Sequence, residues 1–132
     1  MINLIYGAKG SGKTKKIIDA ANACAADAKG DVVYITDNDK SLEIGSTIRF
    51  INVNDYDIHC KGCLVGFLKG MIAANSDNTK FYIDGVGRIL DKKPDEMEEL
   101  FKKLEEISDR YGVDFTLTIS AAEVPKFMKR YL

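Results

Sequence analysis

An eight-residue stretch near the start of the chain constrains the fold more than any other feature. It runs from Gly7 to Thr14 and has the pattern G-x-x-x-x-G-K-[ST]. The apolar run before it, Ile2 to Tyr6, predicts a β-strand, and the segment from Lys13 to about residue 28 predicts a helix with one apolar stripe. A glycine-rich turn between a strand and a helix gathers backbone N–H groups at the positive end of that helix. We therefore expect an α/β fold built around an anion site.

The chemistry of this stretch is that of a phosphate cradle. The pattern is the Walker A motif, or P-loop, whose glycines let the backbone turn tightly and approach phosphate oxygens. The ammonium group of Lys13 can reach the β- and γ-phosphates of a nucleotide, and the hydroxyl of Thr14 can bind Mg²⁺. The residues predicted to bind the nucleotide are the whole stretch: Gly7, Ala8, Lys9, Gly10, Ser11, Gly12, Lys13 and Thr14.

Length and composition narrow the class of protein. The 132 residues suit one domain spanning 1–132, and an apolar content of 45% can fill its core. A net charge of −1 does not favour a large nucleic-acid surface. The start of the chain lacks the basic region of a signal peptide, and the longest apolar-leaning stretch, Leu64 to Ala74, is too short to span a bilayer. We therefore expect a cytoplasmic protein.

The rest of the chain alternates strands with helices, which predicts a parallel sheet. Parallel strands place the loops after their carboxyl ends on one edge, so polar residues at those ends should gather beside the P-loop. The expected strands are 32–36, 48–53 near a sheet edge, 81–84 and 115–120. The expected helices are 61–75, 94–111, a short one at 125–131 and one or two turns at 40–44, with a turn at 76–79.

Asp84 occupies the position of a Walker B aspartate, because it follows a short apolar strand directly. Mg²⁺ commonly takes one carboxylate together with phosphate oxygens and water, so Thr14 and Asp84 are the predicted metal residues. The alternative is that Asp84 and Gly85 form only a strand-end turn. Many ATPases carry a water-activating glutamate directly after this aspartate, and this chain has Gly85 there.

Three further strand-end residues are candidates for catalysis. Asp37 and Asp39 follow the second expected strand and could orient an attacking water, although the same residues also suit a polar turn. Ser120 ends the last strand and could act as a sensor of the γ-phosphate, or it could cap a turn.

Other patterns have simpler interpretations. Cys60 and Cys63 suit a helix start with partly buried thiols better than a metal site, which needs four ligands. Glycines at 62, 66 and 70 favour close packing of a helix onto the sheet over an oligomer contact. In an oligomer, an arginine could reach a neighbour's site; the candidates are Arg88, Arg110 and Arg130.

The chain resembles the P-loop NTPase superfamily. The features that carry this resemblance are the Walker A motif, the strand from Phe81 to Asp84, the amphipathic helix to Tyr111 and the strand ending at Ser120. Within it, the chain is similar to a minimal RecA/KaiC-like ATPase core and to small bacterial P-loop proteins. This resemblance implies a three-layer α/β/α fold with a five-stranded, mainly parallel sheet in the order 5-1-4-2-3. That family carries paired glutamates where this chain has Asn38 and Asp39, a departure that bears on hydrolysis.

The function expected from these residues is Mg²⁺-dependent binding of ATP or ADP, with slow ATP hydrolysis, in a switch or a subunit of a homo-oligomer or of a complex with another protein. One alternative is a module that binds nucleotide without hydrolysing it. A small-molecule or nucleotide kinase is a third, although no Arg-rich lid is apparent. ATP is the expected nucleotide because no N-K-x-D stretch, the usual guanine-binding pattern, follows a strand.

Overall fold

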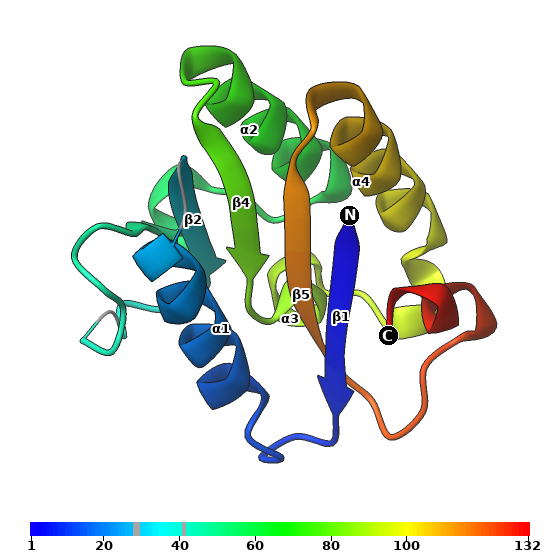
Figure 1. The fold of residues 1–132 in the computed structure, drawn as a ribbon. Helices are drawn as coiled ribbons and strands as arrows, with labels where there is room; N and C mark the ends of the chain where they lie inside the picture. Colours follow the sequence, from blue (N-terminus) through cyan, green and yellow to red (C-terminus); the bar gives the residue numbers. More distant parts are fainter. Residues whose placement is uncertain (28–29, 41) are drawn as a thin grey trace.

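The computed structural model describes residues 1–27, 30–40 and 42–132. Their core is a five-stranded sheet in the order β1-β5-β4-β2-β3, in which every neighbouring pair is parallel. Figure 1 shows β4, β5 and β1 side by side and pointing in the same direction. The strands are β1 (Ile2–Gly7), β2 (Asp31–Thr36), β3 (Arg49–Asn52), β4 (Asn78–Ile83) and β5 (Asp114–Ser120).

Helices cover both faces of the sheet, and the core on one face is larger than the core on the other. On one face, Ile17, Ile18 and Ala21 of α1 pack against apolar side chains of β2 and β4. On the other, the buried leucines of α2 and α4 join a larger core that includes the apolar side chains of β5. The α-helices are α1 (Lys13–Asp27), α2 (Lys61–Ala74), α3 (Val86–Leu90) and α4 (Glu98–Tyr111), and the 3-10 helices are η1 (Val53–Tyr56), η2 (Pro94–Glu96) and η3 (Lys126–Tyr131). This arrangement is compatible with the expected three-layer α/β/α fold.

The expected strand order was wrong at one edge of the sheet. β5 lies between β1 and β4, so the strand that leads into the P-loop is an edge strand rather than an inner one. The side chains fit this position, because Ile2 and Leu4 are buried whereas Asn3 and Tyr6 are exposed. In β5, by contrast, Leu117, Thr118 and Ile119 are all buried, as expected for a strand covered on both faces.

Most expected elements are confirmed, with shifted boundaries. Asn78 and Thr79 belong to β4 instead of to the turn predicted for them, and the helix expected from Pro94 begins as η2 before α4. The terminal helix is η3, and α3 was not predicted. The predicted end of the first helix, residue 28, lies outside the described residues, as does residue 41. The helical turns expected at 40–44 were wrong for the rest of that segment, because residue 40 is not helical and residues 42–44 form a turn and a bend.

Two expectations for α2 were wrong. Its three glycines do not pack on the sheet: Gly62, Gly66 and Gly70 are exposed, and a Cβ added at any of them would meet no atom within 4 Å. Cys60 and Cys63 are exposed rather than partly buried, and their sulfurs are paired as a disulfide. The backbone N–H of Cys63 donates to the sulfur of Cys60, which caps the first turn of α2.

No helix within residues 1–27, 30–40 and 42–132 is long and apolar enough to cross a membrane.

The larger core predicts where the fold is most sensitive. The ring of Phe115 is fully buried in β5, with its centroid 5.4 Å from that of Phe81. Phe115→Ala should lower the free energy of unfolding by about 3–5 kcal/mol, because it removes buried area and leaves a cavity. Urea unfolding followed by circular dichroism measures this. Tyr111→Ala, which removes a ring that is 42% exposed, is the matched control and should cost about 0.5 kcal/mol; equal losses would contradict the assigned core.

Candidate functional site: the P-loop and the carboxyl ends of β2, β4 and β5

The backbone of the loop between β1 and α1 turns tightly. Gly10 and Gly12 have φ angles of +83° and +91°, in the left-handed region that favours glycine. The N–H of Ser11 donates to the carbonyl of Ala8 at 3.1 Å. A Cβ added at Gly7 would overlap the Oγ of Ser11, which would have to rotate away. Glycine at positions 10 and 12 thus follows from the local backbone geometry.

Lys13 is held inside this loop. Its Nζ donates to the carbonyl oxygen of Ala8 at 3.0 Å, and the residue is only 9% exposed. A hollow of about 350 Å³ lies beside it, bordered by the glycines at 10 and 12 and by Ser120 at the end of β5. A buried ammonium at the rim of a polar hollow is suited to bind an anion there.

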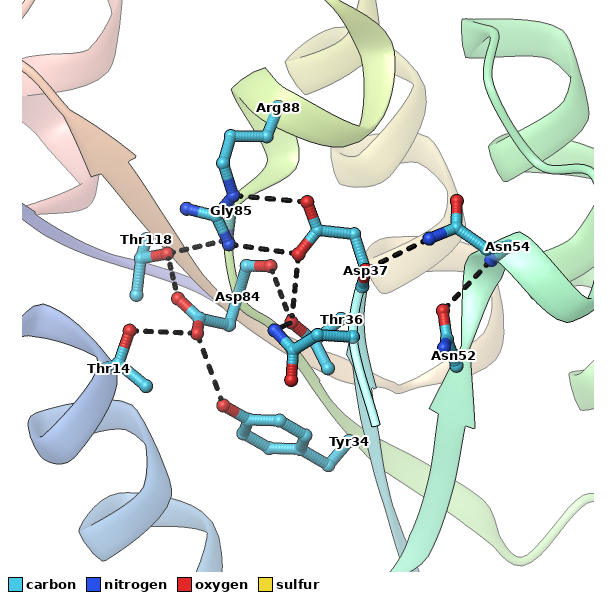
Figure 2. Close-up of polar contacts among 11 residues, drawn as sticks. Thr14, Tyr34, Thr36, Asp37, Asn52, Asn54, Asp84, Gly85, Arg88 and Thr118 are labelled. Carbon is cyan, nitrogen blue, oxygen red and sulfur yellow. Dashed lines mark hydrogen bonds and ion pairs between the residues drawn. The ribbon is translucent and has the colours of Figure 1, made fainter. Parts of the chain in front are cut away.

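Asp84 is the central buried charge of the site. It follows β4 directly and is 3% exposed. Thr14 donates to its Oδ2 at 3.0 Å, Tyr34 donates to the same oxygen at 3.4 Å, and Thr118 donates to Oδ1 at 2.7 Å. Figure 2 shows these hydroxyls converging on the carboxylate from α1, β2 and β5. The predicted metal pair, Thr14 and Asp84, is therefore in direct contact.

The hydroxyl of Thr118 makes a second hydrogen bond, and the hydroxyl of Tyr34 keeps its proton. Thr118 accepts the N–H of Gly85 at 2.8 Å, so one hydroxyl fixes both the carboxylate and the turn that follows it. Burial raises the pKa of Tyr34, and the negative charge of Asp84 raises it further, so Tyr34 stays protonated and remains a donor.

The donor set at this point fits a hard divalent cation. Mg²⁺ prefers oxygen ligands and usually retains several waters. The Thr14 hydroxyl and the Asp84 carboxylate offer such oxygens at the edge of the hollow, and both are held in position by hydrogen bonds. Among the described residues, no cluster of three or more His, Cys, Asp or Glu side chains forms an all-protein metal cage.

The candidate water-orienting residue Asp37 is paired with a cation. Arg88 donates to both of its carboxylate oxygens, from Nε and from Nη2, at 3.1 Å each. Burial alone would raise the pKa of Asp37, but the hydrogen bonds and charge of Arg88 outweigh it and hold that pKa below its usual value. Asp37 is thus a poor proton acceptor while this pair is intact.

Gly85 and Arg88 are in close contact. Gly85 has φ +83° and is the N-cap residue directly before α3, and a Cβ added there would overlap the guanidinium of Arg88. The position of the water-activating glutamate of many ATPases is therefore covered by an arginine in this chain. Arg88, which the sequence suggested for a neighbour's site, lies within the site of its own chain.

The other two candidates for catalysis, Asp39 and Ser120, border different hollows. Asp39 is exposed and its Oδ1 accepts a hydrogen bond from Asn52 at 2.8 Å. It borders a second hollow of about 720 Å³ that shares Asp84 and Arg88 with the P-loop hollow and extends to the end of β2. Ser120 is exposed at the end of β5 and borders the P-loop hollow itself. The strand ends thus bring all the candidates to one edge of the sheet, but not into one cluster.

Three side chains of the candidate site were not predicted from the sequence: Tyr34, Thr118 and Arg88 as a residue of its own chain's site. Tyr34 lies in a run that also suits a buried strand, and α3 is too short for its periodicity to be informative. Thr118 gave one usable signal, since a hydroxyl inside a buried strand must find a partner.

The chain matches no family model and no curated protein sequence.

The bridge made by Thr118 gives a prediction. Thr118→Val keeps the shape of the side chain but removes a donor to the buried carboxylate, and should lower the free energy of unfolding by about 1–3 kcal/mol. Chemical denaturation measures the change. Thr116→Val is the matched control, on the same face of β5 but only half-buried, and should have a smaller effect. Equal effects would mean that the bridge to Asp84 contributes no stability.

Proposed function

We propose that this protein binds ATP or ADP together with Mg²⁺ through the loop from Gly7 to Thr14 and hydrolyses ATP slowly. The observation that carries the proposal is the hydrogen bond between Thr14 and Asp84, which joins the end of the Walker A stretch to a carboxylate 70 residues away. A motif alone is a weak argument, but a motif whose hydroxyl meets a buried strand-end carboxylate beside a polar hollow is a stronger one.

Each residue has a role that follows from its position. The loop N–H groups and the Lys13 ammonium bind phosphate oxygens, for which Lys13 exchanges the carbonyl of Ala8. Thr14 and Asp84 hold Mg²⁺, with Thr118 and Tyr34 orienting the carboxylate. Bound Mg²⁺ supplies positive charge that stabilises the charge on the transferring phosphate. Asp37 or Asp39 orients water, and Ser120 contacts the phosphate from β5. The protein then acts as a nucleotide-dependent switch or as a subunit of an oligomer.

A second candidate is a module that binds the nucleotide and does not hydrolyse it. Two observations favour it: position 85 has no carboxylate, and Asp37 is held by Arg88. Release of inorganic phosphate that disappears in both Lys13→Ala and Asp84→Asn would exclude this candidate.

Removing the Lys13 ammonium should abolish nucleotide binding. In the unchanged protein, MgATP at about 100 times its Kd should raise the free energy of unfolding by about 2.7 kcal/mol. In Lys13→Ala this stabilisation should be lost, as measured by the shift in melting temperature with added MgATP. Lys16→Ala, an exposed lysine of the same helix, is the control and should retain the full shift. An unchanged shift in Lys13→Ala would overturn the proposed function.

Removing the Asp84 charge should affect the role of the metal specifically. In Asp84→Asn, the affinity for Mg²⁺ in the presence of nucleotide should fall by about 10- to 100-fold, as expected when a residue that positions a metal is lost. Calorimetric titration of ATP with and without Mg²⁺ measures this. Asp114→Asn is the matched control, since Asp114 pairs with Lys80 at the opposite end of β5, and should leave the Mg²⁺ dependence intact. A Mg²⁺ dependence that survives in Asp84→Asn would exclude Asp84 from the metal site.

A further inference from the structure

Arg88 borders both hollows of the site. It contacts the P-loop hollow together with Lys13 and Ser120, and it contacts the larger hollow together with Asp37 and Asp39. Its guanidinium therefore stands at the boundary between the space beside the phosphate loop and the space beside the end of β2. A cation in this position faces any anion that enters the P-loop hollow.

The partner of Arg88 in this structure is replaceable. Asp37 binds the guanidinium through two parallel hydrogen bonds, a geometry that a phosphate group also satisfies. The side chain of Arg88 is 51% exposed and that of Asp37 is 24% exposed, so the pair is partly screened by water and is weakened accordingly. Arg88 can therefore change partners by rotating its side chain, without movement of the sheet.

Figure 2 shows how the three charges are arranged. The guanidinium of Arg88 lies beside Gly85 and is joined to the carboxylate of Asp37, whereas the carboxylate of Asp84 is joined to surrounding hydroxyls instead. Hydrogen bonds to Asp37 raise the pKa of Arg88, and the charge of Asp84 raises it further, so the guanidinium stays charged whichever anion it meets. Asp84 is already bound by hydroxyls, whereas Asp37 receives its side-chain contacts mainly from Arg88.

We propose that Arg88 distinguishes a nucleoside triphosphate from a diphosphate: it leaves Asp37 to bind the terminal phosphate, and it returns to Asp37 when that phosphate is absent. This inference rests on the proposed nucleotide binding and adds a specificity device to it. Breaking the pair also releases the carboxylate of Asp37 into the larger hollow, so the presence of a third phosphate is transmitted to the end of β2.

The exchange makes a prediction that a merely structural ion pair does not. Arg88→Ala removes the ligand of the terminal phosphate, so the affinity for a non-hydrolysable ATP analogue with Mg²⁺ should fall by about tenfold or more, while the affinity for MgADP should stay within about twofold. Asp37→Asn removes the competitor, so the affinity for the same analogue should rise by about three- to tenfold. Isothermal titration calorimetry measures all four affinities.

The controls separate this inference from the function on which it depends. Arg130→Ala removes an arginine that is paired with Glu105 away from the site, and should change neither affinity. In the double variant Arg88→Ala/Asp37→Asn, the gain from Asp37→Asn should disappear, because the arginine it frees is gone. Melting temperatures without nucleotide should fall similarly in the two single variants, since each loses the same pair.

Each contrary result has a distinct meaning. If Arg88→Ala and Asp37→Asn shift the affinity for the analogue in the same direction, or if Arg88→Ala weakens MgADP and the analogue equally, the pair is structural and the inference is overturned. The proposed nucleotide binding would survive that result. If the unchanged protein binds neither nucleotide in a way that depends on Lys13, both the proposed function and this inference are overturned.

Discussion

The burial of the Asp84 carboxylate is the constraint on which the site depends. Removing an ionised carboxylate from water is costly unless hydrogen bonds replace its hydration. Here, hydroxyls from α1, β2 and β5 supply them, and each donor ties its own element to the end of β4. β1 does not pair with β4, so the glycine-rich loop after β1 is positioned relative to that strand through the side chain of Thr14 and through β5. One buried charge therefore fixes the loop and the strand ends as a unit.

The sequence was informative about elements and much less so about their lateral order. Apolar periodicity predicted the strands and the long helices because it reports which side chains are buried together. Strand order depends on pairing between segments that are distant in the chain, and the order 5-1-4-2-3 came from a resemblance. The exposed Asn3 and Tyr6 of β1 were a local sign of an edge strand, but exposure of single residues is too common to decide a topology.

The residues of the site show the same difference between what local sequence indicates and what tertiary contacts decide. The residues of the glycine-rich loop and Asp84 were singled out as candidates because a short motif and a strand end define them locally. Thr118 was not, because Thr116 precedes it in the same strand and looks equivalent; only the depth of burial distinguishes the two hydroxyls. The pairing of Asp37 with Arg88 joins residues 51 positions apart through a five-residue helix that has no periodicity to detect. Contacts of this kind are set by tertiary packing, which a single sequence does not report.

Gly85 links the local backbone to the charge arrangement of the site. Its left-handed conformation turns the chain from β4 directly into α3, and that turn returns Arg88 over the main chain at Gly85. A glutamate at this position would need both a strained φ angle and the space that the guanidinium occupies. Glycine at position 85 therefore accounts for both features: it leaves no carboxylate directly after Asp84, and it leaves the space that the guanidinium of Arg88 occupies. In the proposed hydrolysis, an attacking water would therefore be oriented from the end of β2, where Arg88 now holds the carboxylate of Asp37 through two hydrogen bonds.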